Sequence, residues 1–262
     1  MFLYDVVENG LIRDMKRYRL WVSYDGTEYH GWQLQQGSDT IEARLNQALS
    51  DLFQSEICVT GASRTDAGVH AHSNVAVFDA QTRMPAEKIC YALNQRLPET
   101  IRVWKSEEVP ADFHPRHTNV EKTYAYRIHS AKIPNPLKTR YAYHTYLALD
   151  LPVMQEAATG LVGVHDFAAF CAAGSQAKTT VREIRSVSVT QEASDMLVIR
   201  VCGTGFLYNM VRIIAGTLIE IGAGRRDKHS IMKALESGVR TDAGPTAPAC
   251  GLCLEEIRYM EE

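Results

Sequence analysis

Residues 57–80, ICVTGASRTDAGVHAHSNVAVFDA, place a short polar stretch between two apolar runs. The runs ICVTGA (57–62) and SNVAVFDA (73–80) are rich in branched residues, which favour β-strands. The residues between them are small, polar or turn-forming, so we expect a loop presented at a sheet edge or cleft. The stretch therefore predicts a strand, a polar loop and a second strand.

The segments on either side extend this unit. On the N-terminal side, RYRLWVSY (17–24) predicts a strand, and a helix is expected over 40–53 with Asp39 as its cap. On the C-terminal side, a helix is expected from Pro85, followed by a strand over 101–109. The resulting order, β-α-β-β-α-β, is that of a ferredoxin-like unit.

The rest of the chain repeats this order of elements. Strands are expected over 121–129, 181–190, 195–203 and 251–259, and helices over 152–162, 208–222 and 229–238. We therefore predict an α+β fold of two ferredoxin-like (βαββαβ) halves. The predicted domains are an N-terminal extension (1–15), a first ferredoxin-like domain (16–113) and a second one (114–262).

The composition is that of an ordinary globular protein. Of 262 residues, 45% are apolar and 23% charged, which is far from the composition of disordered chains. No apolar run approaches the about 18–20 residues that a membrane span needs. Asp5 and Glu8 interrupt the apolar start where a signal peptide would carry a basic segment. We expect a cytoplasmic protein with no membrane contact.

The chain lacks the motifs that hold common cofactors. There is no phosphate loop, dinucleotide fingerprint or nucleophile elbow. Cys250 and Cys253 form a lone CxxC pair, and His70 with His72 is more typical of a loop entering a strand than of a metal site. We expect no metal, nucleotide or other small-molecule cofactor.

The polar loop carries the candidate chemistry. Asp66 follows Arg64 by two residues, so on an extended backbone both side chains point to one face. A nearby guanidinium lowers the pKa of a carboxyl group and keeps it ionised. An ionised carboxylate can act as a nucleophile or stabilise positive charge. The alternative interpretation is a surface ion pair in a hairpin loop.

Four motifs resemble, in the same order, those of the tRNA pseudouridine synthase A family. SRTDAGVHA (63–71) is similar to the catalytic motif that carries the essential aspartate of that family. The other three are KTYAYR (122–127), GFLYNMVR (205–212) and APACGLCL (247–254), and weaker similarity begins at YDGT (24–27). The resemblance extends from about residue 17 to residue 259.

The resemblance implies a fold, a reaction and partners. It implies two halves whose antiparallel sheets are joined around a central cleft, and a homodimer. It implies an isomerase that converts uridine to pseudouridine in the anticodon stem-loop of tRNA, at positions 38–40. This reaction is redox-neutral, which agrees with the expected absence of a cofactor.

The resemblance also implies roles for single residues. Asp66 is the expected nucleophile; attack on uracil C6, attack on ribose C1′ and uptake of a sugar proton remain open. Arg64 and Arg212 are its expected cationic partners. Tyr124 is expected to stack on the flipped-out uracil, at about 1–3 kcal/mol per base, and its phenol is a candidate acceptor of the C5 proton. Leu252 is expected either to wall the uracil pocket or to lie in the core.

The net charge of −3 argues mildly against a nonspecific nucleic-acid binder but does not exclude a local basic cleft. Affinity for a tRNA stem depends largely on phosphate contacts. Candidates for such a cleft are the basic residues of the second half: Arg116, Lys122, Arg127, Lys138, Arg140, Lys178, Arg182, Arg185, Arg225, Arg226 and Lys228. Trp32 is a candidate either for RNA contact or for anchoring its loop.

Three alternatives stay open at this point. One is a pseudouridine synthase for another RNA or another tRNA position, because target choice depends on cleft shape. Another is a non-catalytic tandem RNA-binding module, although the aromatic signature of RNA-recognition motifs is missing. The last is a small-molecule enzyme with an aspartate nucleophile, which has less need of so many basic residues.

Overall fold

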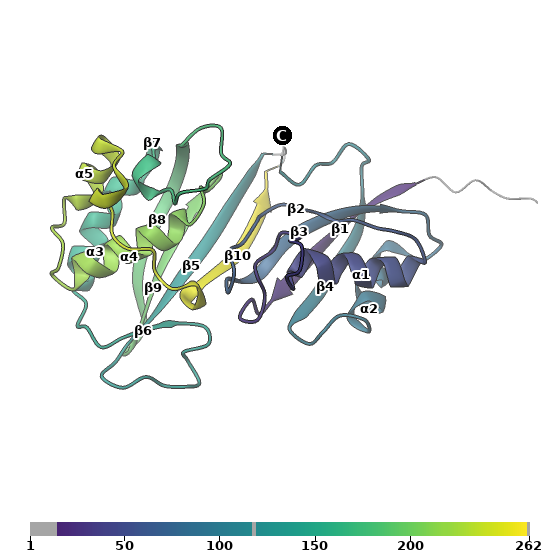
Figure 1. Cartoon of the computed structure of the whole chain (residues 1–262), viewed down its shortest axis with the longest axis horizontal. Coiled ribbons are helices and arrows are strands. Elements are labelled where there is room, and N and C mark those ends of the chain that lie inside the picture. Colours follow the sequence, from purple (N-terminus) through teal and green to yellow (C-terminus); the bar gives the residue numbers. More distant parts are fainter. Residues whose placement is uncertain (1–14, 117–118, 261–262) are drawn as a thin grey trace, which may run out of the picture.

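The computed structural model describes residues 15–116 and 119–260. Ten strands form a single sheet that runs through the length of the molecule (Figure 1). The predicted extension 1–15 lies outside the described residues except for Met15, which is exposed. None of the helices in the described residues is long and apolar enough to cross a bilayer.

The first half has the predicted order of elements. These are β1 (Lys16–Tyr24), α1 (Ile41–Phe53), β2 (Thr60–Gly61), β3 (His70–Ala80), α2 (Ile89–Asn94) and β4 (Ile101–Val109). In the sheet β4 pairs with β1, β1 with β3, and β3 with β2, all antiparallel. Thr40 rather than Asp39 caps α1, since the Thr40 side chain accepts from the amide of Ala43, and Asp39 forms an ion pair with Arg44.

The second half shows the same neighbour order. Its elements are β5 (Val120–Ser130), β6 (Tyr143–Thr145), α3 (Leu151–Ala158), β7 (Gly163–Asp166), β8 (Val181–Ala193), β9 (Met196–Gly203), α4 (Met210–Gly222), α5 (Ser230–Ser237) and β10 (Leu252–Tyr259). The strands follow one another as β10, β5, β9, β8 and β7. The short strands β6 and β7 were not predicted from the sequence.

The two halves are joined between β3 and β10. These strands are parallel and pair through Cys253 with His70 and Leu254 with Ala71. The sheets of the two halves are joined, as predicted, and the two strands at the join are parallel. The short strand β2 pairs only with Val77 and Ala76, which leaves the start of β3 free to pair with β10.

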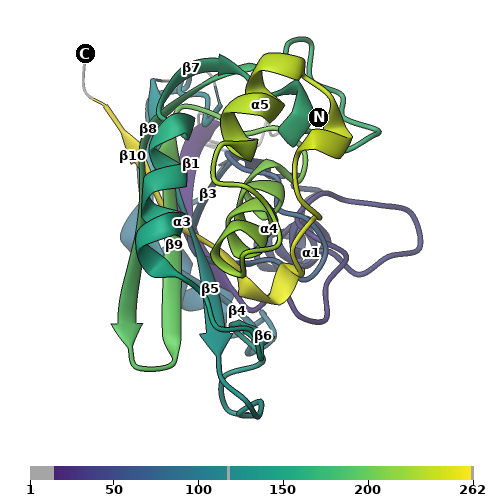
Figure 2. The ribbon, with the colours of Figure 1, turned by 90° about the vertical axis from the view of Figure 1, so that its left-hand side faces the viewer.

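The helices α1, α4 and α5 lie on one side of the sheet (Figure 2). In α1 the buried stripe is Ile41, Leu45 and Leu49, which recur at helical spacing. Buried side chains of both halves form one continuous hydrophobic core. Loops near the join are therefore held by packing from both halves.

Candidate active site

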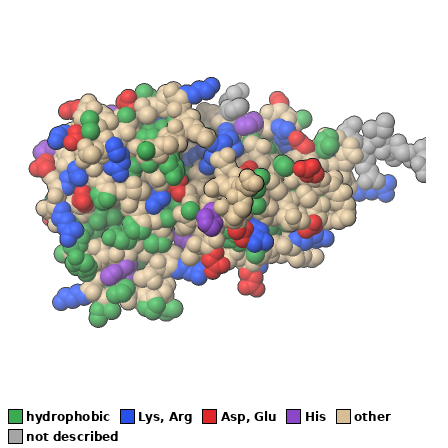
Figure 3. Space-filling model, viewed as in Figure 1, with side chains coloured by type: hydrophobic (Ala, Val, Ile, Leu, Met, Phe, Trp, Pro, Cys, Tyr) green, Lys and Arg blue, Asp and Glu red, His purple; other side chains and the backbone are tan. Residues whose placement is uncertain are grey.

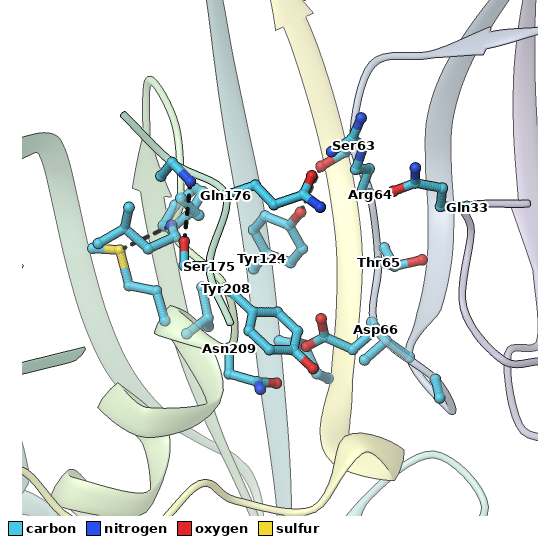
Figure 4. A pocket seen from close by; sticks show the side chains of 18 of the residues that line it. Gln33, Ser63, Arg64, Thr65, Asp66, Tyr124, Ser175, Gln176, Tyr208 and Asn209 are labelled. Carbon is cyan, nitrogen blue, oxygen red and sulfur yellow. Dashed lines mark hydrogen bonds between the residues drawn. The ribbon is translucent and has the colours of Figure 1, made fainter. Parts of the chain in front are cut away.

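A cavity of about 640 Å³ opens where the two halves meet. Figure 3 shows basic side chains beside the hollow between the halves. The catalytic-motif loop (63–69) forms one wall, and β5, the start of α4 and residues 174–177 form the others. Figure 4 shows Asp66, Tyr124 and Tyr208 converging from these elements. The cavity thus collects side chains that are far apart in the sequence.

The loop 63–69 is braced by the loop that follows β1. The amide of Trp32 donates to the carbonyl oxygen of Thr65 at 3.0 Å, and the amide of Gly68 to that of Tyr29 at 3.2 Å. Gly31 has φ +86°, and a Cβ there would lie 2.6 Å from the Thr65 oxygen. Only glycine allows so close an approach. Trp32 itself is 1% exposed, so it anchors its loop rather than meeting RNA.

A network of buried polar groups fixes the loop 63–69 on its inner side. Asn74 Nδ2 donates to the carbonyl oxygen of Ser63 at 2.9 Å and to the hydroxyl of Tyr24 at 3.3 Å. The Tyr24 hydroxyl lies 2.8 Å from Thr65 Oγ1. Ser63 and Thr65 are buried, whereas Arg64 between them is exposed. The network therefore fixes which residues of the loop face inward.

Asp66 pairs with Arg212, not with Arg64. Arg212 Nη1 lies 3.4 Å from Asp66 Oδ2. The guanidinium is itself held, because its Nε donates to the Ala247 oxygen at 2.8 Å and Nη1 to Asn209 Oδ1 at 2.7 Å. The expected Arg64–Asp66 ion pair does not occur among the described residues. Both residues lie in a turning loop, where spacing by two no longer implies a shared face.

Burial raises the pKa of Asp66, and the charge and hydrogen bond of Arg212 only partly oppose this. The sequence had predicted a lowered pKa, which was wrong in direction. Desolvation of the carboxylate outweighs a single guanidinium at 3.4 Å. The ionised form of Asp66 is therefore poorly solvated.

Tyr124 lies in the cavity wall. Its hydroxyl is 2.7 Å from Ser63 Oγ, and its ring meets Phe206 edge to face at 5.0 Å. Burial raises the pKa of Tyr124 to about 12, against the hydrogen bond from Ser63. Tyr126 on the same strand is fully buried and donates to the Pro248 oxygen, so it is a core residue.

Leu252 lines the cavity at the start of β10 and is 5% exposed. Gly251 precedes it, and a Cβ there would lie 2.7 Å from the Tyr126 ring. The close approach of the chain to Tyr126 carries Leu252 to the cavity wall. Leu252 thus belongs both to the wall and to the core.

Most of the basic residues that were expected to form a cleft do not line the cavity. Only Arg116 and Lys122 of that set line the cavity, where Arg64 joins them. Six others form ion pairs: Arg127–Glu255, Lys138–Asp195, Arg140–Asp25, Arg185–Glu121, Arg226–Glu220 and Lys228–Glu156.

The cavity also holds residues that the sequence did not single out. Ser63, Ser175, Gln176, Tyr208 and Asn209 line it. Tyr208 and Asp66 point toward one another in Figure 4. Tyr208 and Asn209 could have been suspected, since both lie within the motif GFLYNMVR (205–212). Residues 175–176 lie in a loop without any sequence signal.

One group of possible metal ligands occurs in the described residues. Atoms of His72, Cys253 and Glu255 lie within 4.8 Å of one another, away from the residues that line the cavity. Arg127 Nη2 already lies 2.8 Å from Glu255, where it supplies a positive charge. The donor set alone does not assign a metal to this position.

Comparisons with known proteins agree on one family. A model of the tRNA pseudouridine synthase family matches residues 20–117 and 157–260. The tRNA pseudouridine synthase A of Ruminiclostridium cellulolyticum is 44% identical over 94% of this chain and 100% of its own length. That of Myxococcus xanthus is 42% identical over 94% of this chain and 93% of its own length.

Similarity to solved structures is weaker. A chain of the archaeal box H/ACA sRNP Nop10–Cbf5 complex matches with a TM-score of 0.30 and 10% identity, over 86% of this chain and 69% of that chain.

Proposed function

The chain belongs to the tRNA pseudouridine synthase family and is a tRNA-uridine isomerase; we propose that it acts on the anticodon stem-loop, at positions 38–40, with Asp66 as nucleophile. The observation that carries the assignment of Asp66 is its position in the cavity, 3.4 Å from Arg212 and facing the same space as Tyr124. The choice of the anticodon stem-loop is supported by the sequence motifs alone.

The reaction exchanges one bond of the nucleoside for another. The bond between ribose C1′ and uracil N1 breaks, the uracil turns, and a bond forms between C1′ and C5. The proton on C5 leaves and a proton is gained at N1, so no electrons are gained or lost overall. Such a rearrangement requires a group that holds the sugar or the base while the bond is broken. Asp66 is placed to be that group.

The state of Asp66 suits this role. As an ionised carboxylate it can attack an electrophilic carbon or stabilise a developing positive charge on the sugar. Burial leaves it poorly solvated, and Arg212 supplies the positive charge that keeps an ionised fraction available.

Tyr124 provides an aromatic face for the extruded base. Stacking on such a face contributes about 1–3 kcal/mol per base, and Leu252 lies in the same wall. With a pKa of about 12, the phenol keeps its proton near neutral pH. We therefore assign stacking to Tyr124, and we do not assign it the C5 proton.

The proposal includes two further properties. The enzyme works as a homodimer, as the resemblance of its motifs implies, and in the cytoplasm, as expected from the acidic residues Asp5 and Glu8 in its apolar start. The rival that remains is a synthase for another tRNA position, whereas family membership disfavours a non-catalytic RNA-binding module.

Release of tritium from tRNA labelled at uridine C5 tests the proposal. The unmodified protein should release label, and Asp66→Asn should release none while binding tRNA within a few-fold of normal. The exposed Asp51 on α1 gives a matched control, because Asp51→Asn removes a carboxylate far from the cavity.

Two outcomes would count against different parts of the proposal. Turnover by Asp66→Asn would remove the nucleophile assignment. Release that persists when positions 38–40 carry cytidine would remove the anticodon assignment and leave the nucleophile standing.

A further inference from the structure

Three basic side chains line the cavity close to Gly61 and Ala62, just before the loop 63–69. They are Arg64, Arg116 and Lys122. None of them forms an ion pair with a carboxylate among the described residues, although most basic residues of the second half do. Burial lowers the pKa values of Arg116 and Lys122, and neighbouring positive charges add to this: Arg64 acts on Arg116, and Arg116 acts on Lys122.

Lys122 is the central member of this cluster. It precedes Tyr124 by two residues on β5, and its Nζ donates to the carbonyl oxygen of Ala62 at 2.8 Å. An ammonium group has three N–H donors, and this is the one hydrogen bond of the Lys122 ammonium group within the described residues. Burial lowers the pKa of Lys122 to about 8. A partly buried ammonium without a counterion is unfavourable, so the site favours an arriving anion.

Arg116 makes a contact similar to that of Lys122. Its Nε donates to the carbonyl oxygen of Gly61 at 2.7 Å, next to the carbonyl that Lys122 contacts. The acid that acts on Arg116 electrostatically is Glu42, which raises its pKa less than burial and Arg64 lower it. The Oε2 atom of Glu42 instead accepts from the amide of Leu34 at 2.7 Å. Charge in this part of the cavity is therefore positive and largely uncompensated.

The chemistry of the cluster selects a phosphate group. Guanidinium and ammonium groups donate several hydrogen bonds each, and phosphate offers matching acceptor oxygens. The Cα atom of Ala62, whose carbonyl oxygen Lys122 contacts, lies at most about 14 Å from that of Asp66, because the two residues are four apart along the chain. Such a distance is comparable to the length of one nucleotide and its neighbour in an RNA strand.

We propose that Lys122, Arg116 and Arg64 form a subsite for one phosphodiester of the RNA, adjacent to the uridine whose base lies on Tyr124. This inference rests on the proposed function. It adds that the enzyme recognises the backbone of the target nucleotide from inside its cavity. Lys122 binds phosphate and at the same time fixes Ala62 at the entrance to the loop 63–69.

The test uses RNA stem-loops in which a single linkage beside the target uridine is an uncharged methylphosphonate. In the wild-type enzyme, one such linkage, 5′ or 3′, should lower kcat/KM by about tenfold to a hundredfold, as expected for loss of a charge-assisted hydrogen bond. Lys122→Met should lower kcat/KM on the ordinary stem-loop by a similar factor. The same linkage should then cause no further loss in that variant.

The proposal would be overturned if the methylphosphonate lowered kcat/KM of Lys122→Met by the same factor as that of the wild-type enzyme. Such independent losses would mean that Lys122 supports the loop without touching phosphate. Lys122→Gln provides a second variant, since its amide can still donate to Ala62 while lacking the charge. It should behave as Lys122→Met does in the methylphosphonate test. Lys122→Arg should recover most of the activity on the ordinary stem-loop.

A binding measurement gives a readout independent of turnover. In an Asp66→Asn background, Lys122→Met should reduce the salt slope of stem-loop binding by about 0.7–0.9, the value for one lost phosphate contact. Lys88→Met, which removes an exposed lysine outside the cavity, is the control and should leave kcat/KM on the stem-loop unchanged. An unchanged slope for Lys122→Met would contradict the subsite.

Failure of the phosphate subsite can be distinguished from failure of the proposed function by combining the tritium and methylphosphonate measurements. Without tritium release by the wild-type enzyme, the reaction itself is refuted. With normal release and no effect of either methylphosphonate, only the phosphate subsite is refuted.

Discussion

The hydroxyl groups of Tyr124 and Ser63 lie 2.7 Å apart and connect β5 to the loop that carries Asp66. Tyr124 belongs to the second half of the chain and Ser63 to the first. The Tyr124 ring and the Asp66 carboxylate are thereby held in a fixed relative position, although they come from different halves.

Ser63→Ala should slow the reaction by about threefold to tenfold, because one hydrogen bond to a buried hydroxyl contributes about 0.5–1.5 kcal/mol. The effect should appear in single-turnover rates, with tRNA binding nearly unchanged. Ser106 is a matched control: its hydroxyl is also buried and bonds the Ala86 oxygen, away from the cavity. A rate loss of equal size in Ser106→Ala would show a general effect of stability.

Arg212→Met should make activity more sensitive to acid. Arg212 opposes the rise in the pKa of Asp66 that burial causes, so its removal should raise that pKa further. Activity needs the ionised carboxylate and is lost as the pH falls through this pKa. The acid limb of the kcat/KM profile should therefore move to higher pH. At pH 7 the rate should fall by about 10–100-fold, since a hydrogen bond to a charged group is lost. An acid limb at the wild-type position would contradict the pairing.

Asp25→Asn should destabilise the protein in a pH-dependent way. Burial alone would raise the pKa of Asp25, but hydrogen bonds from Thr27, Arg140 and Tyr141 lower it to about 2. A lowered pKa in the folded state stabilises the protein above the unfolded value of 3.8, and this contribution is lost as the pH falls through about 2.

Urea unfolding measures this effect. At pH 7 the free energy of unfolding should drop by about 2 kcal/mol in Asp25→Asn. The difference from the parent should narrow between pH 4 and pH 2. A difference that stays constant over this range would show that the carboxylate charge is not the cause.

Asn74→Ala should impair both stability and rate. The amide holds the Ser63 oxygen and the Tyr24 hydroxyl, and its loss leaves buried polar groups unpaired, at about 1–3 kcal/mol. Asn94→Ala is the control, because Asn94 bonds both the amide and the oxygen of Val103 away from the cavity. Both variants should lose stability in thermal unfolding. Only Asn74→Ala should lose turnover at a temperature where both are folded.

The order of elements could be predicted because it depends on local patterns. Apolar alternation and helical spacing identify strands and helices without knowledge of their neighbours. The join of β3 with β10 could not be predicted in this way. It requires the start of β3 to be left unpaired by the two-residue strand β2, which is a property of the assembled sheet.

The sequence identified the residues of the site better than it identified the contacts between them. The motifs named Asp66, Tyr124 and Arg212, and the structure brings these together. The pairing of Asp66 with Arg64 failed because spacing by two indicates a shared face only on a regular strand. Its actual partner is separated from it by 146 residues. Lys122 was one of many basic residues in the sequence, and only the fold distinguishes it from lysines that already have a carboxylate partner.

The parallel pairing of β3 with β10 also has a consequence for protein synthesis. The polypeptide leaves the ribosome N-terminus first, so the strand that follows Asp66 emerges long before residues 252–259. The Leu252 wall of the cavity reaches Asp66 only when this late segment docks against β3. A chain whose last residues have not yet emerged therefore lacks one wall of its cavity.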